Sequence, residues 1–546
     1  MARLRGAGDD GSAVIGGALV PDNEVQAEPA IDCDVAIVGF GPVGTTLAGL
    51  LGRDGVRTRV FEREREIYTL PRAVHFDHEV MRIFQSLGLG DDDFGHTAPI
   101  LGYDFVNGEG EVLFRVPIRP GEVTHQGWRP DYMFHQPDLE RALRAKVADW
   151  PSLEVHLEHE VLRVEEHDEY VEIDVRDLQS GQVHTFRAGA VVGCDGANSF
   201  VRRAAGLGLD DLEFDEPWLV VDATVDTPPT ELGLPPVPTQ HCDPARPVTY
   251  VPVAGPYIRW EFMLLPGESA EEMMQPERVR ALVGQQVDPT RVKVIRSAVY
   301  DFHALVASSW GTRRVFLAGD SAHQTPPFLG QGMCAGIRDV ANLAWRLRWV
   351  AEGRASREIF ASYQTEREPH VRALIGTAVD MGRIICVLDA AAAAHRDAGF
   401  LVREDRSLPS PASPDIGPGF HLGGDAGGHL ALQARIRSAD GEAQLLDDVT
   451  GPGFTLLVRA PARLDPEALG DETREGPEVS VFTLDRESDV DGAYWAWFDK
   501  QHCDAVLVRP DHIVFGARKG PEAARRLLGE LRDRFLGKQG ELTPSA

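Results

Sequence analysis

The segment VAIVGFGPVG at Val35–Gly44 decides the fold of the N-terminal half of this chain. Its first part, Val35–Val38, is a short and wholly apolar run, which is typical of a strand buried on both faces of a parallel sheet. We expect a helix from about Pro42 to Gly52 and a second strand at Thr58–Phe61. Together these segments predict a β-α-β unit of the kind that binds nucleotides.

The glycines of this segment each have a physical reason. Gly39 allows the tight turn out of the strand, Gly41 lets backbone amides approach a pyrophosphate, and Gly44 lets helix and strand pack closely. Glu62 ends the second strand, where a carboxylate accepts hydrogen bonds from an adenosine ribose. The alternative is a glycine-rich turn with a solvent-exposed acid. The motif favours nucleotide binding but does not separate FAD from NAD.

Two later segments bear on that choice, VVGCDGANSFVR at Val191–Arg202 and VFLAGDSAHQTPPFLGQGM at Val315–Met333. Asp320 follows an apolar strand, where a short acid binds a ribityl hydroxyl or a pyrophosphate-linked water. Gly330, Gly332 and a helix starting near Met333 offer backbone amides to the pyrimidine edge of a flavin. Taken alone, the third segment could also be a strand, a turn and a helix capped by Asp320.

These three motifs together closely resemble the single-component FAD-dependent aromatic hydroxylases, the para-hydroxybenzoate hydroxylase-like family, over about Cys33–Val387. The segments RAVHFDHEVMRIFQSLGL (Arg72–Leu89), HQPDLERALR (His135–Arg144) and RWEFMLLPGE (Arg259–Glu268) are similar to the branch that contains 3-(3-hydroxyphenyl)propionate hydroxylase and phenol-type hydroxylases. The resemblance implies a monooxygenase. NAD(P)H reduces FAD, dioxygen adds at flavin C4a, and the hydroperoxide hydroxylates a phenolic ring.

The resemblance also implies roles for individual residues. The ADP part of FAD would be held by Gly39, Gly41, Gly44, Glu62 and Arg63. The phosphate and ribityl region would contact Arg72 and Gln136, and the isoalloxazine would be lined by Gly319, Asp320, Pro326, Gly332 and Met333. Asp195 and Gly196 would touch both FAD and the reduced nicotinamide, with Ser199 and Arg202 supporting their turn.

Catalysis and substrate binding are less well defined by the sequence. A phenol has a pKa of ~10, so the site should assist its deprotonation. Candidate catalytic residues are His323, Pro326 and Tyr250, with His75 and His241 as further possible relays. A histidine in a strand-to-helix loop is more often structural than catalytic, which is the competing interpretation of His323.

The substrate wall is predicted from the strand Ile258–Leu265, whose side chains alternate between two faces. We expect Trp260 and Phe262 to line an aromatic pocket together with Phe328. On the opposite face we expect Arg259 and Glu261 to pair in solvent.

The predicted fold class is α/β: a Rossmann-like FAD-binding domain with an inserted β-rich substrate domain and a C-terminal thioredoxin-like α/β domain. The predicted boundaries are a mobile N-terminal tail at 1–30, the FAD-binding domain at 31–210 and 306–405, the substrate domain at 211–305, a linker at 406–428 and the C-terminal domain at 429–546. The C-terminal domain resembles the appendage of phenol hydroxylase relatives in AVLVRPDHIVFG (Ala505–Gly516). It lacks C-x-x-C, so packing or a dimer interface is favoured over redox exchange.

Composition limits the partners. A net charge of −30 argues against nucleic acid and anionic membrane surfaces. Six scattered cysteines indicate a reducing, cytoplasmic setting, and no apolar run is long enough for a bilayer span. We expect no metal. The expected partners are a small aromatic substrate and dioxygen, and the resemblance implies a homodimer.

Several alternatives stay open at this point. A flavin halogenase is disfavoured because W-x-W-x-I-P is missing, and a disulfide reductase because the cysteine pair is absent. A tailoring hydroxylase of polyketide-type aromatics fits the same motifs. A non-catalytic dinucleotide-fold binding protein would not need both Asp195 and Asp320 motifs. Neither the ring nor the choice between NADH and NADPH follows from the sequence.

Overall fold

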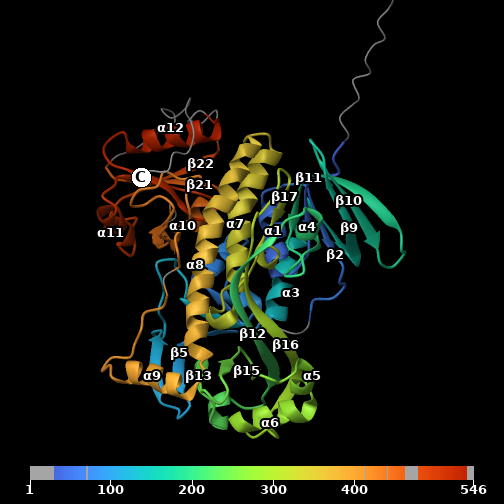
Figure 1. Cartoon of the computed structure of the whole chain (residues 1–546). Coiled ribbons are helices and arrows are strands. Elements are labelled where there is room, and N and C mark those ends of the chain that lie inside the picture. Colours follow the sequence, from blue (N-terminus) through green and yellow to red (C-terminus); the bar gives the residue numbers. More distant parts are fainter. Residues whose placement is uncertain (1–29, 69–71, 412, 439–440, 462–476, 538–546) are drawn as a thin grey trace, which may run out of the picture.

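A computed structural model describes residues 30–68, 72–411, 413–438, 441–461 and 477–537 (Figure 1). The predicted mobile tail at 1–30 lies outside these residues except for its last position, and residue 412 of the predicted linker lies outside them as well. Among the described helices, none is both long enough and apolar enough to cross a membrane.

The Rossmann-like domain is built on a mixed sheet with the order β8-β2-β1-β11-β10-β9, and β17 pairs with the end of β11. The strands β1, β2, β8, β11 and β17 run parallel, while β9, β10 and β11 form an antiparallel ribbon. Their bounds are β1 Cys33–Val38, β2 Thr58–Glu62, β8 Leu153–Leu157, β9 His159–Glu166, β10 Val171–Asp177, β11 Val183–Gly193 and β17 Val315–Leu317. The predicted β-α-β unit is confirmed, with a helix at Pro42–Arg53.

Helices cover this sheet and connect it to the rest of the molecule. Two long ones, α7 and α8, run through the centre of Figure 1 and reach both the C-terminal domain and the second sheet. The helices of this region are α1 Pro42–Arg53, α2 His78–Gln85, α3 Gln136–Val147, α4 Phe200–Ala204, α7 Gly332–Ala351 and α8 Ala361–Ile385, whereas α9 Ala390–Leu401 lies beside the second sheet (Figure 1). A small sheet of β3 His75–Asp77, β7 Asp131–Phe134 and β4 Thr97–Pro99 lies beside them.

The second domain is a large sheet with the order β18-β16-β12-β15-β14-β13-β5-β6. Its strands are β5 Gly102–Asn107, β6 Val112–Pro117, β12 Leu209–Thr224, β13 Thr239–Cys242, β14 Val248–Pro252, β15 Tyr257–Met263, β16 Lys293–Ala307 and β18 His323–Gln324. Helices α5 Ala270–Met273 and α6 Pro276–Gln286 cover one face and form a separate core with it. The hairpin β5–β6 precedes the predicted substrate domain in sequence and joins through parallel pairing of β5 with β13.

The C-terminal domain has the strand order β22-β21-β23-β24, with β21 and β22 parallel and the other pairs antiparallel. This order, with helices before β23 and after β24, is the thioredoxin-like arrangement predicted from the sequence. Its elements are β19 Arg435–Arg437, β20 Ala443–Leu445, α10 Leu446–Thr450, β21 Phe454–Arg459, β22 Val479–Leu484, α11 Ala493–Lys500, β23 Ala505–Val508, β24 Val514–Arg518 and α12 Ala523–Phe535. Cys503 is buried and free, consistent with a packing role.

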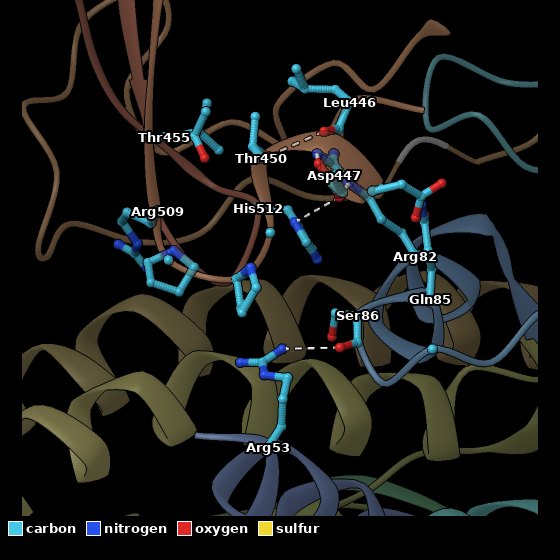
Figure 2. A pocket seen from close by; sticks show the side chains of 17 residues that line it. Arg53, Arg82, Gln85, Ser86, Leu446, Asp447, Thr450, Thr455, Arg509 and His512 are labelled. Carbon is cyan, nitrogen blue, oxygen red and sulfur yellow. Dashed lines mark hydrogen bonds and ion pairs between the residues drawn. The ribbon is translucent and has the colours of Figure 1, made fainter. Parts of the chain in front are cut away.

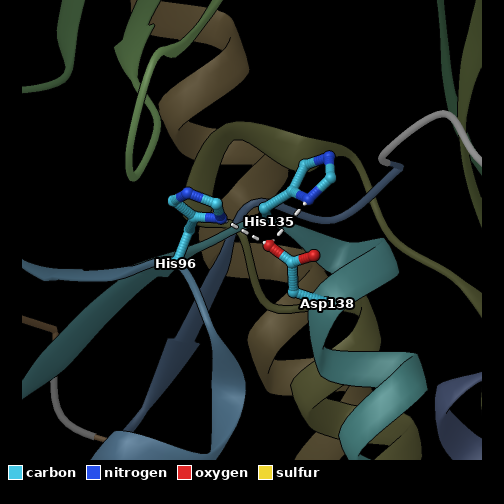
Figure 3. A group of neighbouring side chains, drawn as sticks. All are labelled: His96, His135 and Asp138. Atoms are coloured by element: carbon cyan, nitrogen blue, oxygen red, sulfur yellow. Dashed lines mark hydrogen bonds and ion pairs between the residues drawn. The ribbon is translucent and has the colours of Figure 1, made fainter.

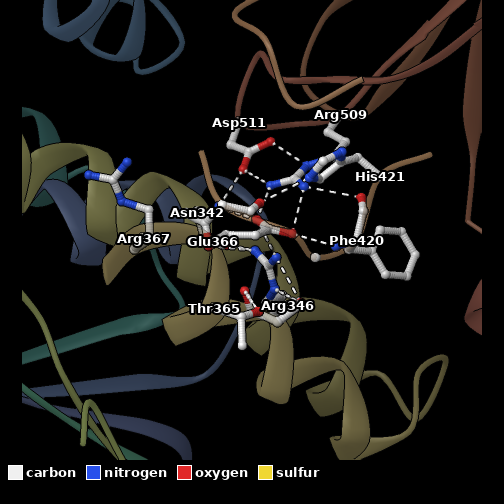
Figure 4. A network of polar contacts seen from close by, with 12 residues as sticks. Asn342, Arg346, Thr365, Glu366, Arg367, Phe420, His421, Arg509 and Asp511 are labelled. Atoms are coloured by element: carbon white, nitrogen blue, oxygen red, sulfur yellow. Dashed lines mark hydrogen bonds and ion pairs between the residues drawn. The ribbon is translucent and has the colours of Figure 1, made fainter. Parts of the chain in front are cut away.

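A buried ionic network joins this domain to the Rossmann-like domain (Figure 4). The Glu366 carboxylate of α8 accepts hydrogen bonds from Arg346 of α7 at 2.8 Å and from both Nη atoms of Arg509 at 2.9 and 2.8 Å. Asn342 and Asp511 complete the network. Burial alone would raise the pKa of Glu366, but Arg346 and Arg509 outweigh it and hold the pKa well below its ordinary value.

A second contact between the same domains lies at a pocket lined by α1, α2 and the C-terminal domain (Figure 2). Arg82 donates from Nε and Nη2 to the two oxygens of Asp447, at 2.6 and 2.9 Å. Burial, followed by the charge of Arg82, lowers the pKa of the neighbouring His512 to about 4, so this ring is neutral at pH 7. Both contacts fix the C-terminal domain against the helices that follow the nucleotide motifs.

We predict that Glu366→Gln destabilises the protein by about 3–5 kcal/mol, because it leaves two buried guanidinium groups without a full counter-charge. The measurement is the midpoint of denaturant unfolding followed by tryptophan fluorescence. Asp491→Asn, which removes an exposed partner of Arg435, is the control and should move the midpoint far less. Equal shifts for the two variants would contradict the importance of the buried network.

Candidate active site

The glycines of the first motif differ in the space around them. Gly39 has φ +101°, and a Cβ there would lie 2.4 Å from the carbonyl oxygen of Cys194. A Cβ on Gly44 would lie 2.1 Å from the oxygen of Gly39, so both positions need glycine for close packing. A Cβ on Gly41 would meet no atom within 4 Å, and α1 begins there with no side-chain cap. The first amides of α1 therefore face open space, which suits a pyrophosphate.

Glu62 stands next to the first motif. Its Oε2 accepts a hydrogen bond from the Phe40 amide at 2.7 Å, and its Oε1 accepts one from the Glu64 amide at 2.9 Å. The acid is thus held beside the first turn, where a ribose would lie. Arg63, predicted to help bind the same part of the cofactor, points into solvent with 72% of its side chain exposed and pairs with Glu64.

The second motif braces the third. Asp195 Oδ2 accepts from the amides of Phe200 and Val201 at 2.7 and 3.0 Å, which caps the start of α4. Ser199 accepts from the Arg202 amide, and Arg202 Nη1 donates to the Ser321 carbonyl at 2.9 Å. A Cβ on Gly196 would meet open space. The turn at Asp195–Gly196 therefore lies beside the third motif and has open space at Gly196.

The third motif is fixed by a buried acid that the sequence analysis missed. Asp339 of α7 accepts from the Gly319 amide at 3.1 Å, from His323 Nε2 at 2.7 Å and from Arg367 Nε at 2.9 Å. Burial would raise the pKa of Asp339, but the charges of His323 and Arg367 prevail and lower it. The sequence does hold a signal for this residue: Asp339 is an acid within an otherwise apolar stripe of a predicted helix, and a buried acid needs fixed partners.

The surroundings of His323 fit a positioning role rather than the catalytic role considered above. Its side chain has 0% exposed surface, so it has no face that could touch a substrate. It contacts Asp339 and lies 5.3 Å from the ring of Trp310. The histidine therefore orients Gly319 and the following turn through Asp339.

Asp320 and the start of α7 belong to the third motif. Asp320 is exposed, although protein atoms surround much of its carboxyl. The resulting loss of water raises the pKa of this carboxyl, and the charges of His323 and Arg72 oppose the rise. Helix α7 begins at Gly332 without a side-chain cap and without an acid in its first turn. A Cβ on Gly332 would meet no atom within 4 Å, and Met333 is half-buried beside it. These amides are free to bind an electron-rich ring edge.

The loop before α7 is anchored on the small sheet. Pro326 is buried and precedes a short 3-10 turn at Pro327–Leu329, and Gly330 follows with φ +64°. His75 Nδ1 lies 3.3 Å from the Gly330 carbonyl, and His75 Nε2 lies 2.7 Å from Asp131. Burial opposes the charge on His75, but Asp131 prevails and raises its pKa.

Arg72 and Gln136, both predicted to contact the phosphate and ribityl region of FAD, lie next to each other. Gln136 Oε1 accepts from the amides of Arg72 and Ala73 at 2.7 and 2.8 Å, while the Arg72 side chain is exposed. Beside them, Asp138 lies 2.7 Å from His96 Nδ1 and 3.0 Å from His135 Nδ1 (Figure 3). This group braces the start of α3, the helix that begins with Gln136.

The predicted substrate wall divides between two cores. Trp260, Phe262 and Tyr250 are fully buried on the face of the large sheet that packs against α6. Phe328 belongs to the other core, where its ring lies 5.8 Å from that of Trp218 and 5.9 Å from that of Phe214. The structure therefore does not bring Phe328 together with the other three aromatic residues. Their apolar face is used for packing against the covering helix.

The opposite face of β15 carries Arg259 and Glu261, and the expectation that they pair in solvent is wrong. Their exposed fractions are 3% and 8%. Arg259 donates from Nε to Asp222 at 2.7 Å and from Nη1 to the Arg72 carbonyl at 2.8 Å. Charged residues on a sheet face indicate solvent only when nothing covers that face, and here the Arg72 segment covers it.

Open space at Gly41 and Gly332 and the uncapped starts of α1 and α7 fit the binding of FAD between the β1–α1 turn and the start of α7. Comparisons with known proteins agree. A model of the FAD binding domain family matches residues 32–378, and a model of the HcaD C-terminal domain matches residues 428–534.

Similar proteins cover almost the whole chain. A protein named "Probable NADH-specific resorcinol 4-hydroxylase" from Rhodococcus jostii is 38% identical over 507 residues, covering 90% of this chain and 93% of that protein. A 3-(3-hydroxy-phenyl)propionate/3-hydroxycinnamic acid hydroxylase from Burkholderia cenocepacia is 36% identical, covering 88% and 93%. The structure of aklavinone-11 hydroxylase with FAD and aklavinone has a TM-score of 0.75 at 24% identity, covering 93% and 99%, and shares the fold.

The chain therefore belongs to the FAD-binding-domain family of aromatic hydroxylases. The flavoprotein monooxygenase class predicted from the three motifs is confirmed, and so is the FAD cofactor. The halogenase, disulfide reductase and non-catalytic interpretations are set aside.

We predict that Gly41→Val abolishes FAD retention while the protein still folds, because the new side chain occupies the open space at the start of α1 and clashes with no protein atom at its Cβ. The measurement is the flavin absorbance of the purified protein per chain. Gly376→Val, a site in α8 with similarly open surroundings, is the control and should keep its flavin. Full flavin content in Gly41→Val would contradict this placement of the pyrophosphate.

Proposed function

We propose that the protein hydroxylates a single-ring phenol, with NADH as the reductant of its FAD. The observation that carries this proposal is the position of the face of the large sheet that points away from α6 and carries Arg259, Glu261 and Met263. That face lies between the Arg72 segment, which Arg259 contacts, and the loop of Phe328, which Trp218 contacts. We assign this face to the substrate wall, facing the residues assigned to FAD.

The protein's own groups supply binding and orientation. The starts of α1 and α7 bind the cofactor through backbone amides, and Asp339 keeps the turn at Gly319 in place. Bound FAD supplies hydride acceptance and oxygen activation. The Pro326–Gly330 loop and the aromatic rings around Phe328 exclude water from one end of the site. Phe328 thus stays in the proposed substrate wall, whereas Trp260, Phe262 and Tyr250 support it from behind.

The substrate class and reductant rest on the relatives. The two curated relatives are named for resorcinol and for hydroxyphenylpropionate or hydroxycinnamate, all with one aromatic ring, and one is named as NADH-specific. A polyketide-type substrate is the second candidate. The likeness to aklavinone-11 hydroxylase shows the fold alone, so it does not favour that candidate over a single ring.

We further propose a cytoplasmic homodimer. The six cysteines are all free, which suits a reducing compartment, and dimers are common among the hydroxylases that the sequence resembles. Light scattering during size-exclusion chromatography tests the dimer. A monomer at micromolar concentrations would contradict it.

The purified enzyme should be yellow and should oxidise NADH faster when a phenol is added, with one hydroxylated product formed per NADH for a true substrate. The measurement pairs NADH consumption with product analysis across single-ring phenols and a polycyclic phenol. NADPH serves as the comparison reductant. A preparation that binds FAD yet responds to no single-ring phenol would overturn the proposed substrate class.

A further inference from the structure

The face of β15 that points away from α6 carries three buried side chains in order along the strand. Arg259 contacts the Arg72 carbonyl at one end, and Met263 joins the core that contains Phe328 at the other. Glu261 lies between them, and residues two apart on a strand point to the same face about 6–7 Å from each other. The register places Glu261 opposite Val220 of β12 and Thr249 of β14, in the middle of the wall.

The Glu261 carboxylate is buried but poorly satisfied. Within the described part of the chain it makes no hydrogen bond, and its only ion pair is a long one of 3.8 Å to Arg259. Its neighbours are already engaged, because Thr249 donates to Gln240 at 2.6 Å and Arg259 donates to Asp222 at 2.7 Å. Buried carboxylates normally have hydrogen-bond donors, so this one has acceptor capacity left for a ligand.

The adjoining part of the same wall suits an aromatic ring. Trp218 lies diagonally across from Glu261 on β12 and is surrounded by Phe302 and Phe328, at ring distances of 5.8 Å each. Trp218 itself is fully buried, and Phe302 beside it is half-buried, so a flat ring against Phe302 would bring a polar substituent toward β15. The wall therefore pairs an apolar, aromatic end with a single acceptor at its centre.

We propose, on the basis of the hydroxylase function above, that Glu261 determines the substrate. Its carboxylate accepts a hydrogen bond from a second hydroxyl on the ring and disfavours a ring that carries a carboxylate side chain. The preferred substrate is then a neutral benzenediol rather than a hydroxyphenyl acid. This preference is expected because the Glu261 carboxylate binds a hydroxyl donor and repels a second carboxylate.

The charge state of Glu261 gives this proposal a distinctive pH dependence. Burial raises the pKa of Glu261 to about 7, with the Arg259 charge opposing and the Asp222 charge adding to the rise. Arg296 of β16 also faces this end of the wall, opposite Asp222 and 3.3 Å from it. Below pH 7 the neutral acid should tolerate a carboxylated ring, and above pH 7 the anion should reject it.

The experiment measures dissociation constants for the oxidised holoenzyme from the change in flavin absorbance, without turnover. The ligands are resorcinol, its monomethyl ether 3-methoxyphenol, and 3-(3-hydroxyphenyl)propionate, each at about pH 6 and about pH 8, where neither phenols nor simple carboxylic acids titrate. The proteins are the wild type, Glu261→Gln, and Glu277→Gln, which makes the same exchange on the exposed start of α6.

We expect the wild type to prefer resorcinol over both other ligands by at least about tenfold at pH 8, because a hydrogen bond to a charged group is strong. The preference over the carboxylated ring should shrink at pH 6. In Glu261→Gln both preferences should fall toward unity and lose their pH dependence, while Glu277→Gln behaves as the wild type. Flavin content and thermal unfolding verify that each variant is folded.

Two results would overturn the inference while leaving the proposed function intact. The first is a wild type that hydroxylates phenols but prefers the carboxylated ring at pH 8. The second is a folded, flavin-containing Glu261→Gln with unchanged preferences. A wild type in which no single-ring phenol stimulates NADH oxidation would instead refute the proposed function itself.

Discussion

The buried carboxylate of Asp339 is the interaction on which the active-site architecture depends. It joins a backbone amide of the third motif, a histidine of the following turn and an arginine of α8 at a single point inside the protein. Removing an acid from water is costly unless its partners are fixed, so α7, α8 and the Gly319 turn are held in one arrangement. The positions assigned to FAD depend on that arrangement.

The parts of the fold that were predictable are those with local causes. The β1–α1–β2 unit follows from an apolar run, spaced glycines and a helix-compatible segment, all within Cys33–Glu62. That the last domain is a small α/β unit likewise followed from short apolar strands and a closing helix, whereas its thioredoxin-like fold was expected from the resemblance to phenol hydroxylase relatives. The Glu366–Arg509 contact could not be predicted in this way, because its partners are separated by 143 residues and no local pattern pairs them.

The substrate wall shows a different limit. Alternation along β15 correctly separated Trp260 and Phe262 from Arg259 and Glu261, but it could not say which face meets the cofactor. Aromatic side chains were assigned to an aromatic ligand, whereas the sheet packs Trp260 and Phe262 against α6. Whether Arg259 is buried depends on a tertiary contact, because the Arg72 segment that covers it is distant in sequence.

The same buried ions that fasten the C-terminal domain also restrict how such enzymes can be recombined. Glu366 and Arg346 come from the central helices, and Arg509 comes from the last domain. A chimera could take its last domain from a relative that has no arginine at position 509. The buried Glu366 carboxylate would then lose one of its two arginine partners, which is destabilising. Workable crossovers must therefore exchange α7, α8 and the terminal domain as one block, even though their sequence ranges are far apart.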